Sequence, residues 1–502
     1  MNSESGQNAG LGHRVTAAAA WMVGFRWIDR LIGVASLAIL ARLLTPGDFG
    51  VVGYATLVIG VLELFTGIST DIELIRHRQA DRAHYDAAWT MNCLRGLAIS
   101  ALMLALARPA AAFFHEPKLA AVMFALAAIP LIQGLENVGI VDFRKQLQFD
   151  REFRFLLVSR LVGTVATLGL AFALQSYWAL VAGSLLRTAF RVALSYGLHP
   201  FRPRFDFARV PEMFRFSRWM MLQNLATGLN DRLPGIVIGR EWSSDALAYF
   251  NVSKEIAEVS TTEVRAPIRR VLFPGISQIA DQRQRLAEVL VKSTGMLALL
   301  TAPIPLGIAL VADDLVPLFL GTQWQPVVQV LQPLCVAGSI AALGTNSALA
   351  YLALDRSHLT AIAASLRAVV LLGLLLVVTP SYGIVGAAYA VAGVTIAMAV
   401  ADYALASRLL QIDARRFLGV VWRPVAAALA MAAGVWLLRS GVARPEDLTG
   451  HARLLIGETL LGAAIYVLVV AGLWIAGDRR EGPERSLVAL TKDVFGRGAR
   501  AR

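Results

Sequence analysis

The sequence contains few of the residues that soluble enzymes use for catalysis or metal binding. Only 16% of its 502 residues are charged, and it has seven histidines, five lysines and two cysteines. Soluble domains are about 25% charged, so this composition excludes an ordinary soluble, disordered or nucleic-acid-wrapping protein. Cys93 and Cys335 lie in separate apolar runs, which excludes a disulfide framework. The histidines are scattered, and none has a carboxylate or cysteine at the spacing of metal ligands.

Apolar runs fill most of the chain. Hydrophobic residues make up 57% of the sequence, and the mean hydropathy is +0.60. The runs are about 20 residues long, the length that a helix needs to cross a bilayer. We therefore predict an all-α, polytopic membrane protein with about fourteen transmembrane helices. The predicted spans are 16–41, 49–70, 87–107, 119–141, 155–174, 177–198, 215–238, 246–270, 292–312, 326–351, 358–378, 383–406, 418–438 and 454–476.

The placement of arginine predicts the orientation of these spans. The net charge is +12, and arginines gather in the loops after even-numbered spans and in the tail, whereas the loop at 312–325 has no lysine or arginine. The positive-inside rule then places both termini in the cytoplasm. The first apolar run contains Arg26, Asp29 and Arg30, charges that a cleavable signal peptide would exclude.

A faint internal repeat indicates the domain organisation. Residues 41–50 resemble residues 239–248, and each stretch joins the first two spans of a six-span set. We predict two six-helix bundles followed by two further helices. The predicted parts are a cytoplasmic N-terminus at 1–14, bundles at 15–200 and 201–410, additional helices at 411–477 and a basic cytoplasmic tail at 478–502. Turns are expected at Asp313–Asp314 and at Thr379–Ser381.

Ionisable groups inside predicted spans are candidates for function, because a charge in the bilayer is costly. Arginine pairs one helical turn apart lie in spans 1 and 6, and arginines outnumber carboxylates in the first half of the chain. An anion is expected to balance them, and guanidinium groups suit phosphate oxygens. The candidate binding residues are Arg26, Arg30, Arg95, Arg187, Arg191, Asn230 and Lys254.

A second interpretation of these charges remains open. Pairs such as Arg26 with Asp29, Asp231 with Arg232, and Lys254 with Glu258 would then hold helices together. Two single arginines have a separate interpretation: Arg160 is expected to extend toward the interface, and Arg367 has no partner recognisable in the sequence.

Three carboxylates are candidates for coupling to a cation gradient. Glu63, Asp231 and Glu258 lie within predicted spans and are expected to be buried there. Arginine cannot release its proton in the working pH range, so such coupling would need carboxylates.

Three stretches carry a resemblance to a known family. They are LARLLTPGDFG at 40–50, a segment from Asn230 to Pro274, and GIVGAA at 383–388. In order and spacing they resemble the Wzx-type polysaccharide flippases of the multidrug/oligosaccharidyl-lipid/polysaccharide (MOP) exporter superfamily. One departure is Glu241–Ser244, where relatives usually carry a small residue or glycine.

The resemblance implies a MATE-like fold and a bacterial inner-membrane protein that is not an enzyme and has no cofactor. It implies transport of undecaprenyl-pyrophosphate-linked oligosaccharides to the periplasmic leaflet by alternating access, with proton or sodium coupling as an option. The implied partners are the lipid-linked oligosaccharide, membrane lipids, and a polysaccharide polymerase with its chain-length machinery, but no nucleic acid. On this basis the candidate residues would bind the pyrophosphate and glycan.

Three alternatives remain. A lipid II flippase would share the arginines, and a cation-coupled small-molecule exporter would favour an acidic cavity rather than this basic one. A membrane glycosyltransferase or polymerase is disfavoured because the spans leave no large outer loop. The acidic pair Asp71 and Glu73 closes span 2 on the predicted cytoplasmic side, where a helix-end pair is the better interpretation.

Overall fold

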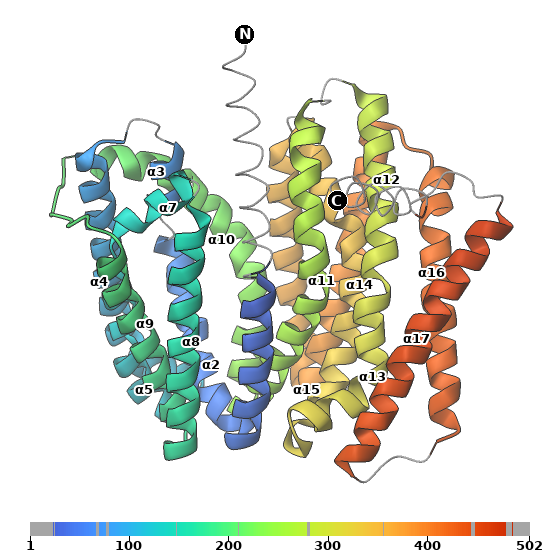
Figure 1. Cartoon of the computed structure of the whole chain (residues 1–502), viewed down its shortest axis with the longest axis horizontal. Helices are drawn as coiled ribbons and strands as arrows, with labels where there is room; N and C mark the ends of the chain where they lie inside the picture. Colours follow the sequence, from blue (N-terminus) through green and yellow to red (C-terminus); the bar gives the residue numbers. More distant parts are fainter. Residues whose placement is uncertain are drawn as a thin grey trace, which may run out of the picture. The chain divides into compact units, whose positions relative to one another are not determined.

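The computed structural model describes residues 24, 26–66, 70–76, 80–146, 148–208, 210–278, 282–354, 356–442, 447–477 and 484. All regular secondary structure within these residues is helical, so the prediction of an all-α chain is confirmed (Figure 1). The predicted N-terminal segment at 1–14 and, apart from Glu484, the basic tail at 478–502 lie outside the described residues.

The chain divides into two compact units, which share α10 and α11. The first unit comprises Met1–Arg232 and Gly239–Ala248, and the second comprises Leu233–Ile238 and Tyr249–Arg502. This division differs from the predicted bundles at 15–200 and 201–410, whose boundaries stay a prediction.

The helices of the first unit begin with residues 26–43. They continue with α2 (Pro46–Thr66), α3 (Thr70–Arg76), α4 (Arg82–Phe113), α5 (Lys118–Leu126), α6 (Ala128–Gly134), η1 (Val138–Ile140), α7 (Val141–Lys145), α8 (Phe149–Leu174), α9 (Trp178–Leu198) and most of α10 (Val210–Glu241). The second unit holds most of α11 (Ser244–Gln278), then α12 (Arg283–Thr301), α13 (Pro303–Phe319), η2 (Thr322–Trp324), α14 (Pro326–Ala353), α15 (Ser357–Leu410), α16 (Ala414–Ser440) and α17 (Leu448–Ala476).

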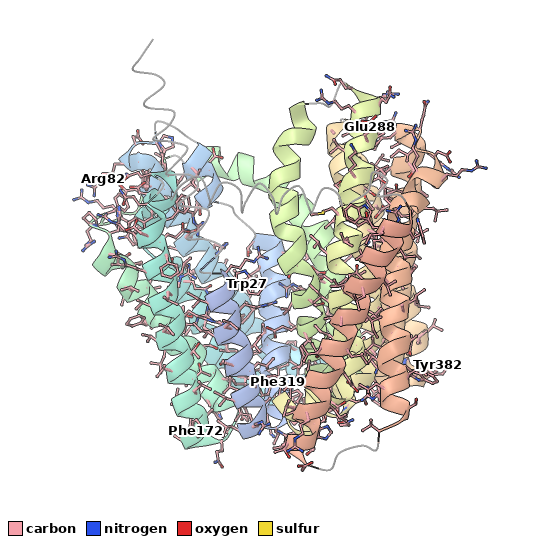
Figure 2. The ribbon with its side chains drawn as sticks, turned by 45° about the vertical axis from the view of Figure 1, so that its right-hand side comes forward. Trp27, Arg82, Phe172, Glu288, Phe319 and Tyr382 are labelled. Atoms are coloured by element: carbon pink, nitrogen blue, oxygen red, sulfur yellow. The ribbon has the colours of Figure 1, made fainter. Side chains whose placement is uncertain are left out.

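Many of these helices have the length and apolarity of membrane spans. Seven described helices could each cross a membrane, and the bent pair Lys118–Gly134 with Val138–Lys145 could form an eighth span, with a bend of 62°. Large apolar side chains such as Phe172 and Tyr382 are 62% and 74% exposed, as lipid-facing residues would be (Figure 2). All fourteen predicted ranges overlap helical residues, but the number of membrane crossings stays a prediction.

The turn expected at Asp313–Asp314 is wrong. Both residues lie inside α13, which ends only at Phe319, so the turn follows later, at Leu320 and Gly321. A separate break within this crossing lies earlier, where Pro303 begins α13 directly after α12. Proline is tolerated at the first position of a helix, because no intrahelical bond needs its missing N–H. Glu288 of α12 and Phe319 of α13 lie at opposite ends of the second unit (Figure 2), so the predicted span at 292–312 is the middle of a longer crossing.

The break between the two predicted spans at 358–378 and 383–406 lies at Gly383. Its φ of 64° and ψ of −152° are non-helical and interrupt α15. Only glycine adopts such a backbone conformation without strain. The turn expected around Pro380 is therefore displaced by a few residues, since Pro380 itself lies within helical residues.

The two stretches of the internal repeat contact each other. A Cβ added at Gly50 would lie 2.0 Å from the backbone oxygen of Ser244, so the two turns are in close backbone contact. In the first turn, the hydroxyl of Thr45 donates to Asp48 at 2.6 Å, and the same carboxylate accepts from the backbone N–H of Tyr177 at 3.0 Å. Asp48 thus fixes the start of α2 against the turn before α9.

Two glycines bring α4 and α6 into close contact. A Cβ at Gly96 would lie 2.3 Å from the backbone oxygen of Pro130, and one at Gly134 would lie 2.7 Å from that of Asn92. Asn92 and Arg95 flank this contact on α4. The close approach fixes the position of both side chains relative to the turn that follows α6.

Candidate functional site

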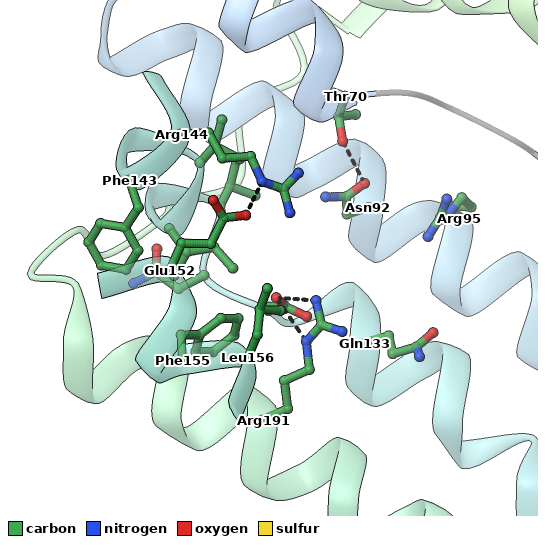
Figure 3. A pocket seen from close by; sticks show the side chains of 15 residues that line it. Thr70, Asn92, Arg95, Gln133, Phe143, Arg144, Glu152, Phe155, Leu156 and Arg191 are labelled. Carbon is green, nitrogen blue, oxygen red and sulfur yellow. Dashed lines mark hydrogen bonds and ion pairs between the residues drawn. The ribbon is translucent and has the colours of Figure 1, made fainter. Parts of the chain in front are cut away.

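A polar cavity of about 480 Å³ lies in the first unit (Figure 3). Its walls come from α3, α4, α6, α8, α9 and the segment from Glu136 to Arg144. Two residues that the sequence singled out, Arg95 of α4 and Arg191 of α9, line it together. The charged lining residues are Arg95, Arg144, Arg191, Glu136 and Glu152.

Arg191 is held by Glu136 and by an aromatic ring. Its Nε and Nη2 donate to Oε1 of Glu136 at 3.3 and 3.1 Å. Its guanidinium also lies 5.5 Å from the centre of the Phe155 ring, within the range of a cation–π contact. The Arg191 side chain remains 40% exposed, so the pair is in contact with the cavity rather than sealed from it.

Two further polar pairs line the cavity. Nε of Arg144 donates to Oε1 of Glu152, which joins the segment before α8 to α8 itself. The hydroxyl of Thr70 donates to Oδ1 of Asn92 at 3.1 Å, joining α3 to α4. Figure 3 shows both pairs, joined by dashed lines, among the side chains that line the cavity.

Because of Arg95, the residues that line the cavity carry a net positive charge. Both lining glutamates are already paired, with Arg191 and Arg144. Within the described residues Arg95 has no ion pair, and its Nε is buried without a hydrogen-bond partner. A guanidinium in that position favours an anion at the site, because an unpaired buried donor is costly.

Asn137 holds the turn behind the cavity. It is fully buried; its Nδ2 donates to the backbone oxygen of Phe201 at 2.8 Å, and its Oδ1 accepts from the N–H of Gly139 at 2.9 Å. Burial lowers the pKa of the neighbouring His199 imidazole below its ordinary 6.5, and the carboxylate of Asp142 opposes that shift. His199 is therefore favoured in its neutral form.

The other arginines among the candidate binding residues, Arg26, Arg30 and Arg187, are not part of the lining of this cavity. Arg187 of α9 packs its stem against Gly163 of α8, and its charge interacts with those of Arg160, Arg191 and Asp29. Arg26 and Arg30 lie on the helix over 26–43, and both have interactions within the chain.

Arg160 differs from its expected arrangement. Its Nε lies 3.1 Å from Oδ1 of Asp29, so it joins α8 to the first helix instead of extending alone toward the interface. Arg367 also has a neighbour that the sequence did not reveal, because its charge interacts with that of Asp402 in the other half of α15.

The predicted residues on α10 and α11 are not part of the cavity. Lys254 lies 3.5 Å from Glu258, which confirms the proposed ion pair, and Asn230 makes its own interactions within the chain. The expectation that Glu63, Asp231 and Glu258 are buried is wrong, because all three are exposed. Their role in ion coupling stays a prediction.

Sequence reasoning missed Arg144, Glu136 and Glu152. Arg144 follows the fourth predicted span, at 119–141, where the arginine pattern predicts a cytoplasmic loop, and Glu136 falls near the end of that span. The bend after α6 and the short η1 turn this polar segment back toward α9. The adjacent polar residues Glu136 and Asn137 inside an otherwise apolar run were the available signal.

The chain is similar to proteins that are named for polysaccharide biosynthesis or transport. A family profile described as "Polysaccharide biosynthesis protein" matches residues 39–329. The lipopolysaccharide biosynthesis protein WzxC of Escherichia coli is 23% identical over 347 residues, covering 66% of this chain and 69% of WzxC. The succinoglycan biosynthesis transport protein ExoT of Rhizobium meliloti is 25% identical over 315 residues, covering 62% of this chain and 63% of ExoT.

Solved structures share the fold. The lipid II flippase MurJ in an inward closed conformation matches with a TM-score of 0.71 at 12% identity, covering 90% of this chain and 98% of MurJ. An inward-facing multidrug resistance MATE family transporter of the MOP superfamily matches with a TM-score of 0.58 at 15% identity, covering 76% of this chain and 94% of that one. The predicted fold class is thus confirmed, and the profile match over more than half of the sequence establishes that the chain belongs to the polysaccharide biosynthesis protein family.

Proposed function

We propose that this chain is a flippase for polyprenyl-pyrophosphate-linked oligosaccharides. It would move them from the cytoplasmic to the periplasmic leaflet of the bacterial inner membrane, for the synthesis of a surface or secreted polysaccharide. Membership of the family supports this function, as do relatives named for lipopolysaccharide biosynthesis and for succinoglycan transport. The chain acts as a transporter and not as an enzyme.

The single observation that carries the proposal is the uncompensated guanidinium of Arg95 in a polar cavity. A pyrophosphate group carries the negative charge that this site lacks, and its oxygens accept charge-assisted hydrogen bonds from guanidinium groups. Arg191, which lines the same cavity from α9, can bind the same anion by exchanging Glu136 for a phosphate oxygen.

The size of the cavity indicates which part of the substrate it would hold. Ligand sites of about 300–1,000 Å³ accommodate drug-sized molecules. A cavity of about 480 Å³ is therefore suited to a pyrophosphate with its first sugar, and not to a whole oligosaccharide. The amides of Asn92 and Gln133 in its lining are suitable hydrogen-bond partners for sugar hydroxyls.

Arg187 extends the proposed anion path along α9. Its guanidinium interacts with the like charges of Arg160 and Arg191, and Asp29 is the one carboxylate among its charged neighbours. An anion passing along this face would relieve the repulsion between the arginines. Arg187, Arg26 and Arg30 would then bind the pyrophosphate in turn as alternating access moves it out of the cavity.

A complementation assay tests this function. In a strain lacking the chromosomal copy, the wild-type chain should restore the surface polysaccharide and Arg95→Ala should not, at equal membrane levels. Arg95→Lys should restore it in part, because lysine keeps the charge and loses the two-pronged geometry. Arg154→Ala is the matched control, since Arg154 is a 74% exposed arginine of α8. Rescue of a strain depleted of its lipid II flippase, with no effect on surface polysaccharide, would contradict the proposal.

A further inference from the structure

A second polar cluster lies in the second unit, at one end of α13, α16 and α17. Nη2 of Arg439 lies 3.1 Å from Oδ2 of Asp313 and 3.2 Å from Oδ2 of Asp314. Nδ1 of His451 lies 2.6 Å from the other oxygen of Asp314. Asp314 therefore joins α13 to α16 and to α17 at once.

This cluster is largely removed from solvent. The side chain of Asp314 is 4% exposed, and those of His451 and Arg439 are 18% and 25% exposed. A net charge in such a buried site has a large free-energy cost, so the stability of the cluster depends on how many protons it binds.

Glu458 lies two turns further along α17. It is 1% exposed, and within the described residues neither of its carboxylate oxygens accepts or donates a hydrogen bond. Residues seven apart lie on the same face of a helix, so Glu458 shares the face of His451 at a distance of about 10 Å along the axis. The charges that reach Glu458 are those of Arg439, Asp314 and Asp313.

The other side of Glu458 is apolar. One turn further along α17, a Cβ added at Gly462 would lie 3.3 Å from side-chain atoms of Met431 and Val435 on α16. Glu458 is thus placed between an ionic cluster and an apolar helix contact, where an ionised carboxylate is strongly disfavoured.

The charges of the whole cluster do not balance without protons. Asp313, Asp314 and Glu458 are three carboxylates, and among the described residues Arg439 of α16 is the permanently charged cation that faces them. With His451 neutral, two negative charges would remain in a buried site. One proton on Glu458 and one on His451 make the cluster neutral.

We propose that Glu458 and His451, together with Asp313, Asp314 and Arg439, form a proton-binding site that holds two protons at this end of α13, α16 and α17. A metal ion fits less well, because no group of three or more histidine, cysteine or acidic side chains in the described part of the chain could hold one.

The site has a direct consequence for transport. Its end of the second unit is the one that the arginine pattern places toward the periplasm, where protons enter during proton-coupled transport. Release of the protons would leave unbalanced negative charge between α17 and the two helices packed against it, α13 and α16, and so favour their separation. This role rests on the proposed flippase function, whereas proton binding itself does not.

Infrared difference spectroscopy tests the site without any substrate. The purified chain in lipid nanodiscs is titrated across neutral pH, and the carbonyl stretch of protonated carboxylic acids is followed. We expect an acid band at neutral pH that is absent in Glu458→Gln and unchanged in Glu288→Gln, whose exposed glutamate on α12 is the matched control. In His451→Gln the band should persist to higher pH, because the positive charge of protonated His451 no longer favours the ionised form of Glu458.

Three results would overturn the proposal. They are identical wild-type and Glu458→Gln spectra at every pH, a band that sodium ions displace at constant pH, and a band with the same pH dependence in His451→Gln as in the wild type. Thermal unfolding of each variant in the same nanodiscs shows whether it is folded. Loss of the band in Glu458→Gln together with failed polysaccharide complementation by the wild-type chain would reject the flippase and retain the proton site.

Discussion

Arg191 of α9 and Glu136, 55 positions earlier in the sequence, form a hydrogen-bonded ion pair at 3.1 Å across the wall of the cavity. The pair places a guanidinium at the site while a protein carboxylate occupies the position that a substrate oxygen would take. Under the proposed function, anion binding would require the release of Arg191 from Glu136. Four predictions follow from the contacts around this cavity and from the orientation of the helices.

Replacing Glu136 with glutamine should strengthen anion binding. The variant removes the competing charge, and since Arg191 is 40% exposed the pair is worth about 0.2–1 kcal/mol, a change of at most about fivefold in affinity. Calorimetric titration of the purified wild type and variant with a short-chain polyprenyl pyrophosphate measures this change in affinity. If Glu136→Gln instead binds the anion more weakly than the wild type, and as weakly as Arg191→Ala, then Glu136 positions Arg191 and does not compete with the anion.

Asn137→Ala should destabilise the first unit. The fully buried side chain donates to two backbone oxygens and accepts from one N–H, and leaving such groups without partners costs about 1–3 kcal/mol. Thermal unfolding in detergent should show a lower midpoint for this variant. Gln146→Ala, at an exposed position of the same segment, is the control and should unfold like the wild type.

His199 should make the stability of the first unit depend on pH. Burial lowers the pKa of the folded state below 6.5, so the unfolded chain takes up this proton at higher pH than the folded chain. Stability from His199 is complete well above the unfolded pKa of about 6.5 and decreases as the pH falls through that value toward the lower pKa of the folded state. His199→Gln should show a smaller decrease of the unfolding midpoint over this range, while the exposed control His358→Gln should match the wild type.

Cysteine labelling tests the orientation. In a background with Cys93→Ala and Cys335→Ala, the exposed positions Thr322 and Arg285 each receive a single cysteine. A membrane-impermeant maleimide added to cells with a permeabilised outer membrane should label Thr322→Cys and not Arg285→Cys. Labelling of Arg285→Cys alone would reverse the predicted topology.

The sequence predicted the helical architecture well because the length of an apolar run is a local signal. It failed where tertiary partners override local signals. The pair Asp313–Asp314 is typical of a turn, but Arg439 and His451 contact these carboxylates, which lie inside a helix. The shift of the break in α15 to Gly383 has a similar origin, since backbone conformation at a glycine is decided by packing.

The residues that line the candidate site were predicted only in part for the same reason. Arg95 and Arg191 could be selected because each is a charge inside an apolar run. Their partners could not, since Glu136 and Arg144 reach the cavity only through the bend after α6. The pairing of Arg160 with Asp29 could not be predicted either, because the two residues lie far apart in the sequence.

The most direct test of the account is translocation in vitro. The purified chain is reconstituted into liposomes that contain a fluorescent polyprenyl-pyrophosphate-linked oligosaccharide, and a glycosidase added outside reports on the glycans that reach the outer leaflet. The account predicts translocation by the wild type and by Arg154→Ala, and a loss of about tenfold or more in Arg95→Ala, from the removal of hydrogen bonds to a charged group. Translocation by Arg95→Ala at the wild-type rate would contradict it.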